Sequence, residues 1–279
     1  GITTIPGSCF YGCSSLNSII LPDSIQFLGY DSFSSCSQLK SITIPEGVTE
    51  LNLSYVFYGC NSLKSISLPS TLKNFTGDLL DCTSNIYFNG SLNQWLHISF
   101  GNRNSFHNSS IHILLYINGE KLTNLTIPES ITSIPEYAFQ CVQLNSVTIP
   151  DSVTSIGEDA FYSSSVTTVR MADSVTSVET NAFANCSNLK KVYYVGDSSK
   201  WNSIAWNSGN GSLIDAKRQF VASFDNIRTV SLGSVEHGTL TLSDDNCIPG
   251  DEITVTAKAD PSYRLKTILV NGQAISGNS

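Results

Sequence analysis

The chain has 279 residues, of which 14% are charged and 41% are hydrophobic, and its formal net charge is −8. This acidic balance disfavours nonspecific binding to nucleic acid or to an anionic membrane. No apolar run reaches the roughly 18 residues that a membrane-spanning helix needs, so we expect no membrane insertion by this chain.

From its first residues the chain repeats one phrase: Ile-Pro, an acidic and a small residue, Val or Ile, two polar residues, Ile, then Ala-Phe and Cys. Residues 44–48, 127–131 and 149–153 show its beginning. The aligned phenylalanines, spaced by 22 to 24 residues within two groups, are Phe10, Phe33, Phe57, Phe139, Phe161 and Phe183. Such a period predicts a solenoid, because no single unit can bury its apolar face alone.

Each unit contains two strand-like parts. The first, seen in residues 39–45, alternates as Ile-x-Ile before Pro, the period-2 pattern of a half-buried strand. The second, seen in residues 153–157, leads into an expected short helical turn at residues 159–161. Pro lacks an amide donor and therefore ends the strand ladder.

Six of the eight cysteines are expected to share one phase of the repeat and to form a vertical stack of small buried thiols. They are Cys13, Cys36, Cys60, Cys82, Cys141 and Cys186. One sulfur per layer does not form a tetrahedral zinc site, and the spacing does not suggest a disulfide framework.

Two similar segments interrupt the array, at 89–121 and 195–220, and they align at Trp95 and Trp201. Both follow an aromatic strand, so each is interpreted as a modified repeat whose short helix carries its Trp inward. The second insert ends the solenoid, and we expect it to act as a cap.

From residue 221 onward the phrase disappears. Residues 221–279 alternate as short strands separated by turns at Gly238, Pro249–Gly250 and Asn271–Gly272. The sequence therefore predicts a small all-β module, which we expect to be truncated, after a solenoid spanning 1–220.

The repeat phrase resembles the BspA-like, or Treponema pallidum-type, leucine-rich repeat, most completely over residues 175–192. The resemblance covers 1–220 in about seven units and implies a leucine-rich repeat solenoid of short strands and short helical turns. It also implies a bacterial secreted or cell-surface protein of a family that acts in adhesion and shares no catalytic residues.

The C-terminal stretch resembles divergent β-repeat modules of bacterial surface proteins. Gly1 lies inside a repeat without a signal peptide before it, so we expect a fragment.

The best candidate binding surface is the strand face of the solenoid, on which outward residues of successive strands form columns. Tyr87, Arg170 and Tyr193 are the expected anchors, since Tyr and Arg dominate interface hot spots. The remaining candidates in these columns are Thr43, Thr126, Thr148 and Lys191. For the threonines, a solvated sheet selected for β propensity is the competing interpretation.

Other candidate sites are weaker. Trp206 could stack on a sugar, although packing is the competing role. The carboxylates after the prolines could in principle bind calcium, and His97, His107 and His112 could bind a metal, but neither set supplies a full ligand shell. No catalytic motif is present, so we expect no enzyme activity, no cofactor and no metal.

We therefore expect a noncatalytic surface protein that adheres to a host matrix or cell-surface protein through its strand face. A glycan-binding surface protein and a passive stalk for a missing domain are the alternatives. The sequence does not identify the partner.

Overall fold

The computed structural model describes residues 1–279 except residue 54 and the ranges 78–83, 102–111, 231, 233–235, 243–245, 250–252, 264–267, 271–272 and 276–279. The chain divides into two compact units, residues 1–220 and 221–279.

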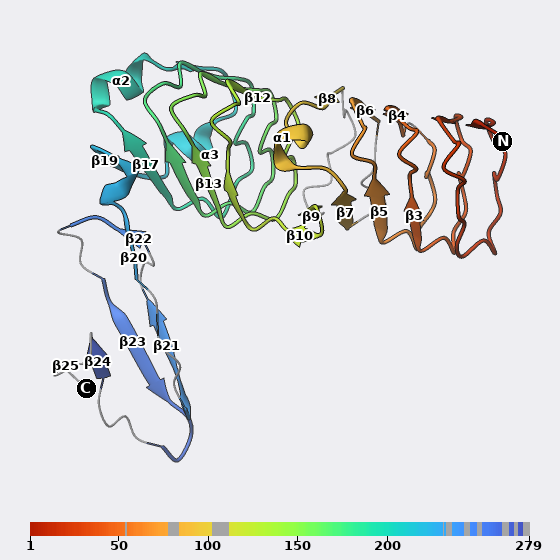
Figure 1. Ribbon diagram of the computed structural model, residues 1–279. Helices are drawn as coiled ribbons and strands as arrows, with labels where there is room; N and C mark the ends of the chain where they lie inside the picture. The colour runs from red at the N-terminus through yellow and green to blue at the C-terminus, as the bar shows by residue number, and fades with distance from the viewer. Residues whose placement is uncertain are drawn as a thin grey trace. The chain divides into compact units, whose positions relative to one another are not determined.

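The first unit is a leucine-rich repeat solenoid whose strand face is built from two ladders (Figure 1). The first ladder contains β3 (Ser41–Thr43), β5 (Ser65–Leu68), β7 (Asn85–Phe88) and β9 (Leu114–Ile117), with β10 (Glu120–Lys121) antiparallel to β9. The second contains β11 (Asn124–Thr126), β13 (Ser146–Ile149), β15 (Thr168–Met171), β17 (Lys191–Val195) and β19 (Lys217–Val221). The solenoid has about nine turns rather than seven, because the two inserts also contribute turns.

Shorter parallel ladders run along a second side of the coil. They are β1 (Thr4–Ile5) with β2 (Phe27–Leu28); β4 (Glu50–Asn52), β6 (Asn74–Thr76) and β8 (Ser99–Phe100); and β12 (Ser133–Ile134), β14 (Ser155–Ile156), β16 (Ser177–Val178) and β18 (Ala205–Trp206). In the strands of both sides apolar residues alternate into the core, which confirms the two predicted strand parts of the repeat.

The two Trp-containing inserts each place a short helix between a strand of the face and a strand of the second side. These helices are α1 (Leu92–Trp95) and α2 (Ser198–Ser203). A capping box between Ser91 and Gln94 starts α1, and the Asp197 side chain caps α2. Trp95 and Trp201 are both buried, which confirms the prediction that each helix carries its Trp inward. After β18, α3 (Gly211–Ile214) buries Leu213 before the chain enters β19.

The segments around the repeat Phe form hydrogen-bonded turns rather than the expected helical turns. The residue two positions before the Phe and the residue two positions after it both have positive φ, as at Asp159 (52°) and Ser163 (54°) around Phe161. The same pair recurs around Phe183, at Asn181 and Asn185, each with φ of 57°. A left-handed residue interrupts a right-handed helix, so a continuous helix cannot form there.

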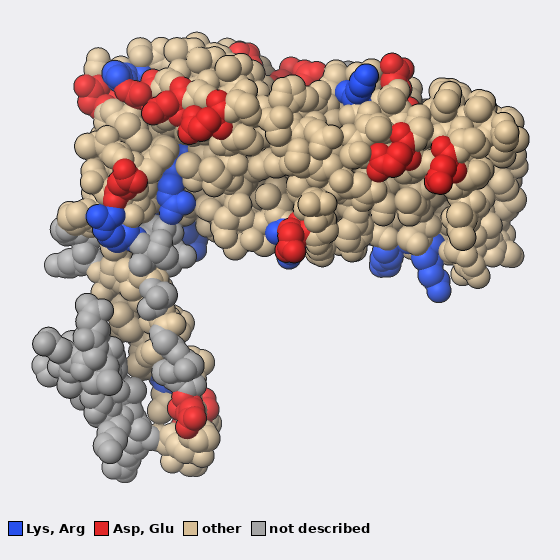
Figure 2. All heavy atoms as spheres, in the orientation of Figure 1, with Lys and Arg blue, Asp and Glu red and all other residues tan. Residues whose placement is uncertain are grey.

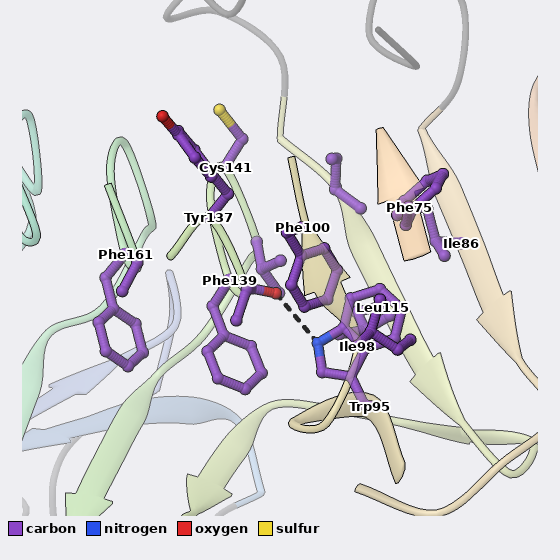
Figure 3. Close-up of a cluster of buried hydrophobic side chains, with 14 of the residues drawn as sticks. Phe75, Ile86, Trp95, Ile98, Phe100, Leu115, Tyr137, Phe139, Cys141 and Phe161 are labelled. Carbon is purple, nitrogen blue, oxygen red and sulfur yellow. Dashed lines mark hydrogen bonds between the residues drawn. The ribbon is translucent and has the colours of Figure 1, made fainter. Parts of the chain in front are cut away.

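The core is one apolar column along the solenoid axis. Phe10 stacks on Phe33, and Phe161 on Phe183, with ring centroids 5.1 and 4.7 Å apart. Between the two Phe groups lies Trp95, whose indole packs against Phe88 and Phe100. The buried Trp95 Nε1 donates a hydrogen bond to the Ala138 carbonyl at 3.0 Å (Figure 3).

The cysteine stack is present, with one correction. Cys36, Cys60 and Cys186 lie three residues after the repeat Phe, and each buried thiol donates to the Phe carbonyl of the preceding coil at 3.0–3.1 Å. Cys141 is buried but lies only two residues after Phe139, at a left-handed position (φ 59°), so the expectation of a shared phase is wrong for it. Cys13 belongs to the first coil and is exposed, and Cys82 lies outside the described residues.

The second unit consists of short antiparallel pairs. The pairs are β20 (Arg228–Thr229) with β22 (Asn246–Cys247), β21 (Gly238–Leu242) with β23 (Val255–Ala259), and β24 (Ile268–Val270) with β25 (Gln273–Ile275). A 3₁₀ turn, η1 (Phe224–Asn226), precedes them. Its described elements are all β apart from this turn.

Candidate functional site

The outward residues of the strand face lie in columns, because the strands are in parallel register. In the first ladder Thr43 pairs with Ser67, which pairs with Tyr87. In the second, Thr126 pairs with Thr148, Thr148 with Arg170, and Arg170 with Tyr193. The face is therefore divided into two columns of equivalent positions, separated by the β9–β10 hairpin.

Tyr87 and Tyr116 form the aromatic centre of the first column. They are paired across β7 and β9, and their rings stack with centroids 4.5 Å apart and an interplanar angle of 20°. Both side chains are half-buried, so each ring packs against its neighbour and keeps part of its surface in solvent. Tyr116 was not predicted as a site residue, because its strand lacks the Ile-Pro phrase. The signal in the sequence was the position of Tyr116 between Leu115 and Ile117, two apolar residues, which is typical of an outward-pointing residue in a strand.

The expectation that Tyr193 and Lys191 point into an open face is wrong. The Tyr193 side chain is 0% exposed and that of Lys191 is 5% exposed. Their strand, β17, lies between β15 and β19 in the ladder, and the Lys191 ammonium is 5.1 Å from the Tyr193 ring centroid. Arg170 is in register with Tyr193 on β15. The Tyr193 ring is therefore not available to a partner.

The other selected residues remain accessible. Thr43 and Thr126 are exposed, and Thr148 and Arg170 are half-buried. Hydroxyls, two stacked phenols and one guanidinium can contact a protein surface, but they provide no acid–base pair or nucleophile for a reaction. Charged side chains are also sparse on the side of the solenoid drawn in Figure 2.

A second aromatic surface lies on the turns of the first coils, and the sequence analysis did not select it. This tyrosine edge consists of Tyr11, Tyr30, Tyr55 and Tyr58, which are 54–61% exposed. The Tyr55 ring is 5.2 Å from that of Tyr30 and 6.1 Å from that of Tyr58. The signal in the sequence was that Tyr11 and Tyr58 each directly follow a repeat Phe.

Trp206 is half-buried and belongs to a packed aromatic group. Its ring centroid is 4.8 Å from that of Trp201, and its Nε1 donates to the Trp201 carbonyl at 3.3 Å. Arg218 belongs to the same group, and its guanidinium carbon lies 4.4 Å from the centroid of the Trp201 ring. These contacts leave less of Trp206 free for a sugar than an isolated surface Trp would offer.

Two carboxylates at the position that follows Pro in most repeats, Glu46 and Asp173, have partners on the next coil, although Asp173 itself follows Ala172. Glu46 accepts a hydrogen bond from the Ser70 hydroxyl at 2.9 Å, and Asp173 forms an ion pair with Lys200. Burial opposes ionisation of Glu46, but hydrogen bonds led by that from Ser70 outweigh it and lower the pKa of this carboxyl. Each of these two carboxylates therefore joins its own turn to the next coil.

Within the described residues, no three His, Cys, Asp or Glu side chains gather in a way that could hold a metal ion. His107 lies outside the described ranges, whereas His97 and His112 are exposed. Among the helices that the structure describes, none is long and apolar enough to cross a membrane.

Comparison with known proteins agrees with this architecture. The pattern of the BspA type leucine rich repeat region matches residues 1–112 and 109–228, in six copies. A leucine-rich repeat protein from Bacteroides ovatus is 20% identical over 80% of this chain and 67% of its own, with a TM-score of 0.35. A leucine rich cell surface protein from Faecalibacterium prausnitzii is 21% identical over 73% of this chain and 72% of its own, with a TM-score of 0.33.

The leucine rich repeat protein of T. pallidum is 21% identical over 80% of this chain and 81% of its own, with a TM-score of 0.29. With TM-scores below 0.5, these structures support no conclusion about this chain. No curated protein matches the chain.

Proposed function

Because the chain belongs to the BspA-type leucine-rich repeat family, we propose that it is a noncatalytic recognition protein, an adhesin that binds another protein through its strand face. We place it at the cell surface or outside the cell, with a host matrix or cell-surface protein as its partner. The observation that carries this proposal is the stacked, half-buried pair Tyr87 and Tyr116 at the centre of an open column.

Aromatic pairs of this kind suit protein recognition for two reasons. Tyr offers a large contact area with few rotatable bonds, and the stacking of Tyr87 on Tyr116 already restricts both rings before a partner arrives. Ser67, the neighbour of Tyr87 on β5, is small and half-buried, and Thr43 beyond it on β3 is small and exposed, so a partner can reach the rings from the side of β3. Arg170 supplies a cation in the second column.

The test begins with a binding screen of the protein against immobilised matrix proteins, mucins and a glycan array. A face variant, Tyr87→Ala with Tyr116→Ala and Arg170→Ala, is compared with an edge variant, Tyr30→Ala with Tyr58→Ala. We expect a saturable protein partner whose affinity falls at least about tenfold, or 1.4 kcal/mol, in the face variant and is unchanged in the edge variant.

Half-buried tyrosines also contribute to packing, so a second face variant adds charge without removing contacts. Thr43→Glu with Thr126→Glu changes two exposed side chains and is expected to weaken the same interaction while leaving the unfolding temperature unchanged. If both face variants bind as tightly as the parent, or only the edge variant loses binding, the strand-face assignment is wrong. A glycan partner without any protein partner, or no partner at all, would favour the lectin or the stalk instead.

A further inference from the structure

The coil that contains Phe161 is one residue shorter than the coil that follows it. Eight positions separate Phe161 from Val169, and nine separate Phe183 from Val192, yet Val169 and Val192 are paired in register. The additional residue therefore has to be accommodated between Cys186 and Val192. Ser187 and Asn188 lie in this longer turn, beside the shorter turn of the preceding coil.

A polar cavity of about 300 Å³ lies where these two turns differ in length. Its lining residues are His112, Ser163, Ser164, Asn185, Ser187 and Asn188. This volume is at the lower end of the range for small-ligand pockets. The lining combines hydroxyls, two carboxamides and one imidazole, and includes no Asp, Glu, Lys or Arg among the described residues.

Ser163 and Ser164 are the buried residues of this lining, with 4% and 2% of their surfaces exposed. The Ser163 Oγ has no hydrogen-bond partner among the described residues. A buried hydroxyl without a partner is unfavourable, so a small rotation that turns the Ser163 hydroxyl toward a molecule in the cavity would gain a hydrogen bond. The position of Ser163 is well defined, because its amide donates to the Ala184 carbonyl at 2.8 Å.

The neighbouring side chains are also held in place. The side-chain amide of Asn185 donates a hydrogen bond to the Tyr162 hydroxyl at 2.9 Å, and the Ser164 hydroxyl lies 3.5 Å from the Cys186 sulfur. Such second contacts orient polar groups before a ligand binds and reduce the entropy cost of binding.

We propose that this cavity binds one neutral sugar ring, as a free monosaccharide or as the terminal unit of a glycan. Hydroxyls and carboxamides can both donate to and accept from the hydroxyl groups of a sugar, whereas a phosphate or sulfate would lack a described cation to balance its charge. The site is separate from the strand face, so it goes beyond the proposed protein recognition and does not depend on it.

The experiment is saturation-transfer NMR followed by calorimetry with a panel of neutral hexoses, deoxyhexoses and N-acetylhexosamines, with inorganic phosphate as the charged probe. Two variants alter the cavity differently: Ser163→Ala removes the buried hydroxyl, and Asn188→Leu replaces an exposed carboxamide of the lining by an apolar side chain. Ser35→Ala is the matched control, since Ser35 occupies the same left-handed position in another coil (φ 62°).

We expect at least one sugar to bind at millimolar concentration, with affinity reduced about tenfold or more in both cavity variants and unchanged in the Ser35→Ala control. Thermal unfolding of all three variants verifies that they fold. The proposal is overturned if no sugar in the panel binds, if binding survives both cavity variants, or if phosphate binds there in preference to the sugars. Loss of strand-face binding would leave these results unchanged, so the two proposals fail independently.

Discussion

At the residue scale, the cysteine thiols act as donors that join successive coils. The Cys186 thiol donates to the Phe161 carbonyl, and burial, only partly offset by hydrogen bonding with Ser164, raises its pKa to about 11. The thiolate is the reactive form, so we expect Cys186 to resist iodoacetamide in the native protein at about pH 8, while the exposed Cys9 and Cys13 react quickly. Peptide mass spectrometry measures this directly, and early labelling of Cys186 would contradict it.

The carboxyl of Asp159 makes stability depend on pH. Burial, assisted by the negative charge of Glu158, raises its pKa from 3.8 to about 6, and one of its oxygens has no partner among the described residues. The folded state therefore binds this proton more tightly than the unfolded state does. Its contribution to stability is fully present below about pH 4 and is lost as the pH rises through 6.

We expect Asp159→Asn to remove this pH dependence and to raise the free energy of unfolding at pH 7 by about 1–2 kcal/mol. The Asn side chain suits the left-handed backbone, as Asn181 shows at the same position of the next coil. Urea unfolding of parent and variant between about pH 4 and 8 gives the comparison, with Asp31→Asn at the equivalent position as control. Parallel pH curves for parent and Asp159→Asn would refute this role.

At the scale of the element, the close approach of neighbouring coils decides which residue can follow a strand. Gly157 follows β14, and a Cβ there would lie 2.5 Å from the Glu136 amide nitrogen and 2.8 Å from the Ile134 carbonyl oxygen. Both are backbone atoms and cannot rotate away. We expect Gly157→Ala to destabilise the protein by about 2 kcal/mol or more, as seen in thermal or urea unfolding.

The control for this substitution is Gly211→Ala at the start of α3. Its nearest neighbour would be an Asp215 carboxylate oxygen at 3.5 Å, which is ordinary contact, and Ala favours a helix over Gly. The control should therefore unfold at the temperature of the parent or above it. Equal stability of the two alanine variants would show that the coils can separate at Gly157 at little cost.

At the scale of the whole solenoid, Trp95 joins the two groups of repeats. Each coil contacts only its neighbours, so cooperativity depends on every interface along the array. The buried hydrogen bond from Trp95 to Ala138 crosses the irregular segment between the groups. We expect Trp95→Phe to lower the free energy of unfolding by about 1–3 kcal/mol and to broaden the transition.

Trp206→Phe is the matched control, because its indole is half-buried and its hydrogen bond to the Trp201 carbonyl is longer, at 3.3 Å. Calorimetry and circular dichroism of both variants test the difference. An equal loss of stability in the two variants, with equally sharp transitions, would mean that Trp95 does not couple the groups.

Much of this architecture could be predicted from the sequence, because the repeat is local information. The Ile-x-Ile alternation, the prolines and the period of the phenylalanines specify the strands, the side that each presents to the core and the stacking of one coil on the next. The inward direction of Trp95 and Trp201 could be predicted for the same reason, since both lie at one position of a modified repeat.

The candidate sites depended on tertiary structure. Tyr87 and Tyr193 occupy equivalent positions, yet one is half-buried beside Tyr116 and the other is fully buried beside Lys191. The cavity at Ser163 lies where two adjacent coils differ in length by one residue. The environment of these side chains depends on residues more than twenty positions away on the neighbouring coil, as with Tyr116 beside Tyr87 and Arg170 in register with Tyr193. A repeat pattern does not encode which of those neighbours is long, short or aromatic.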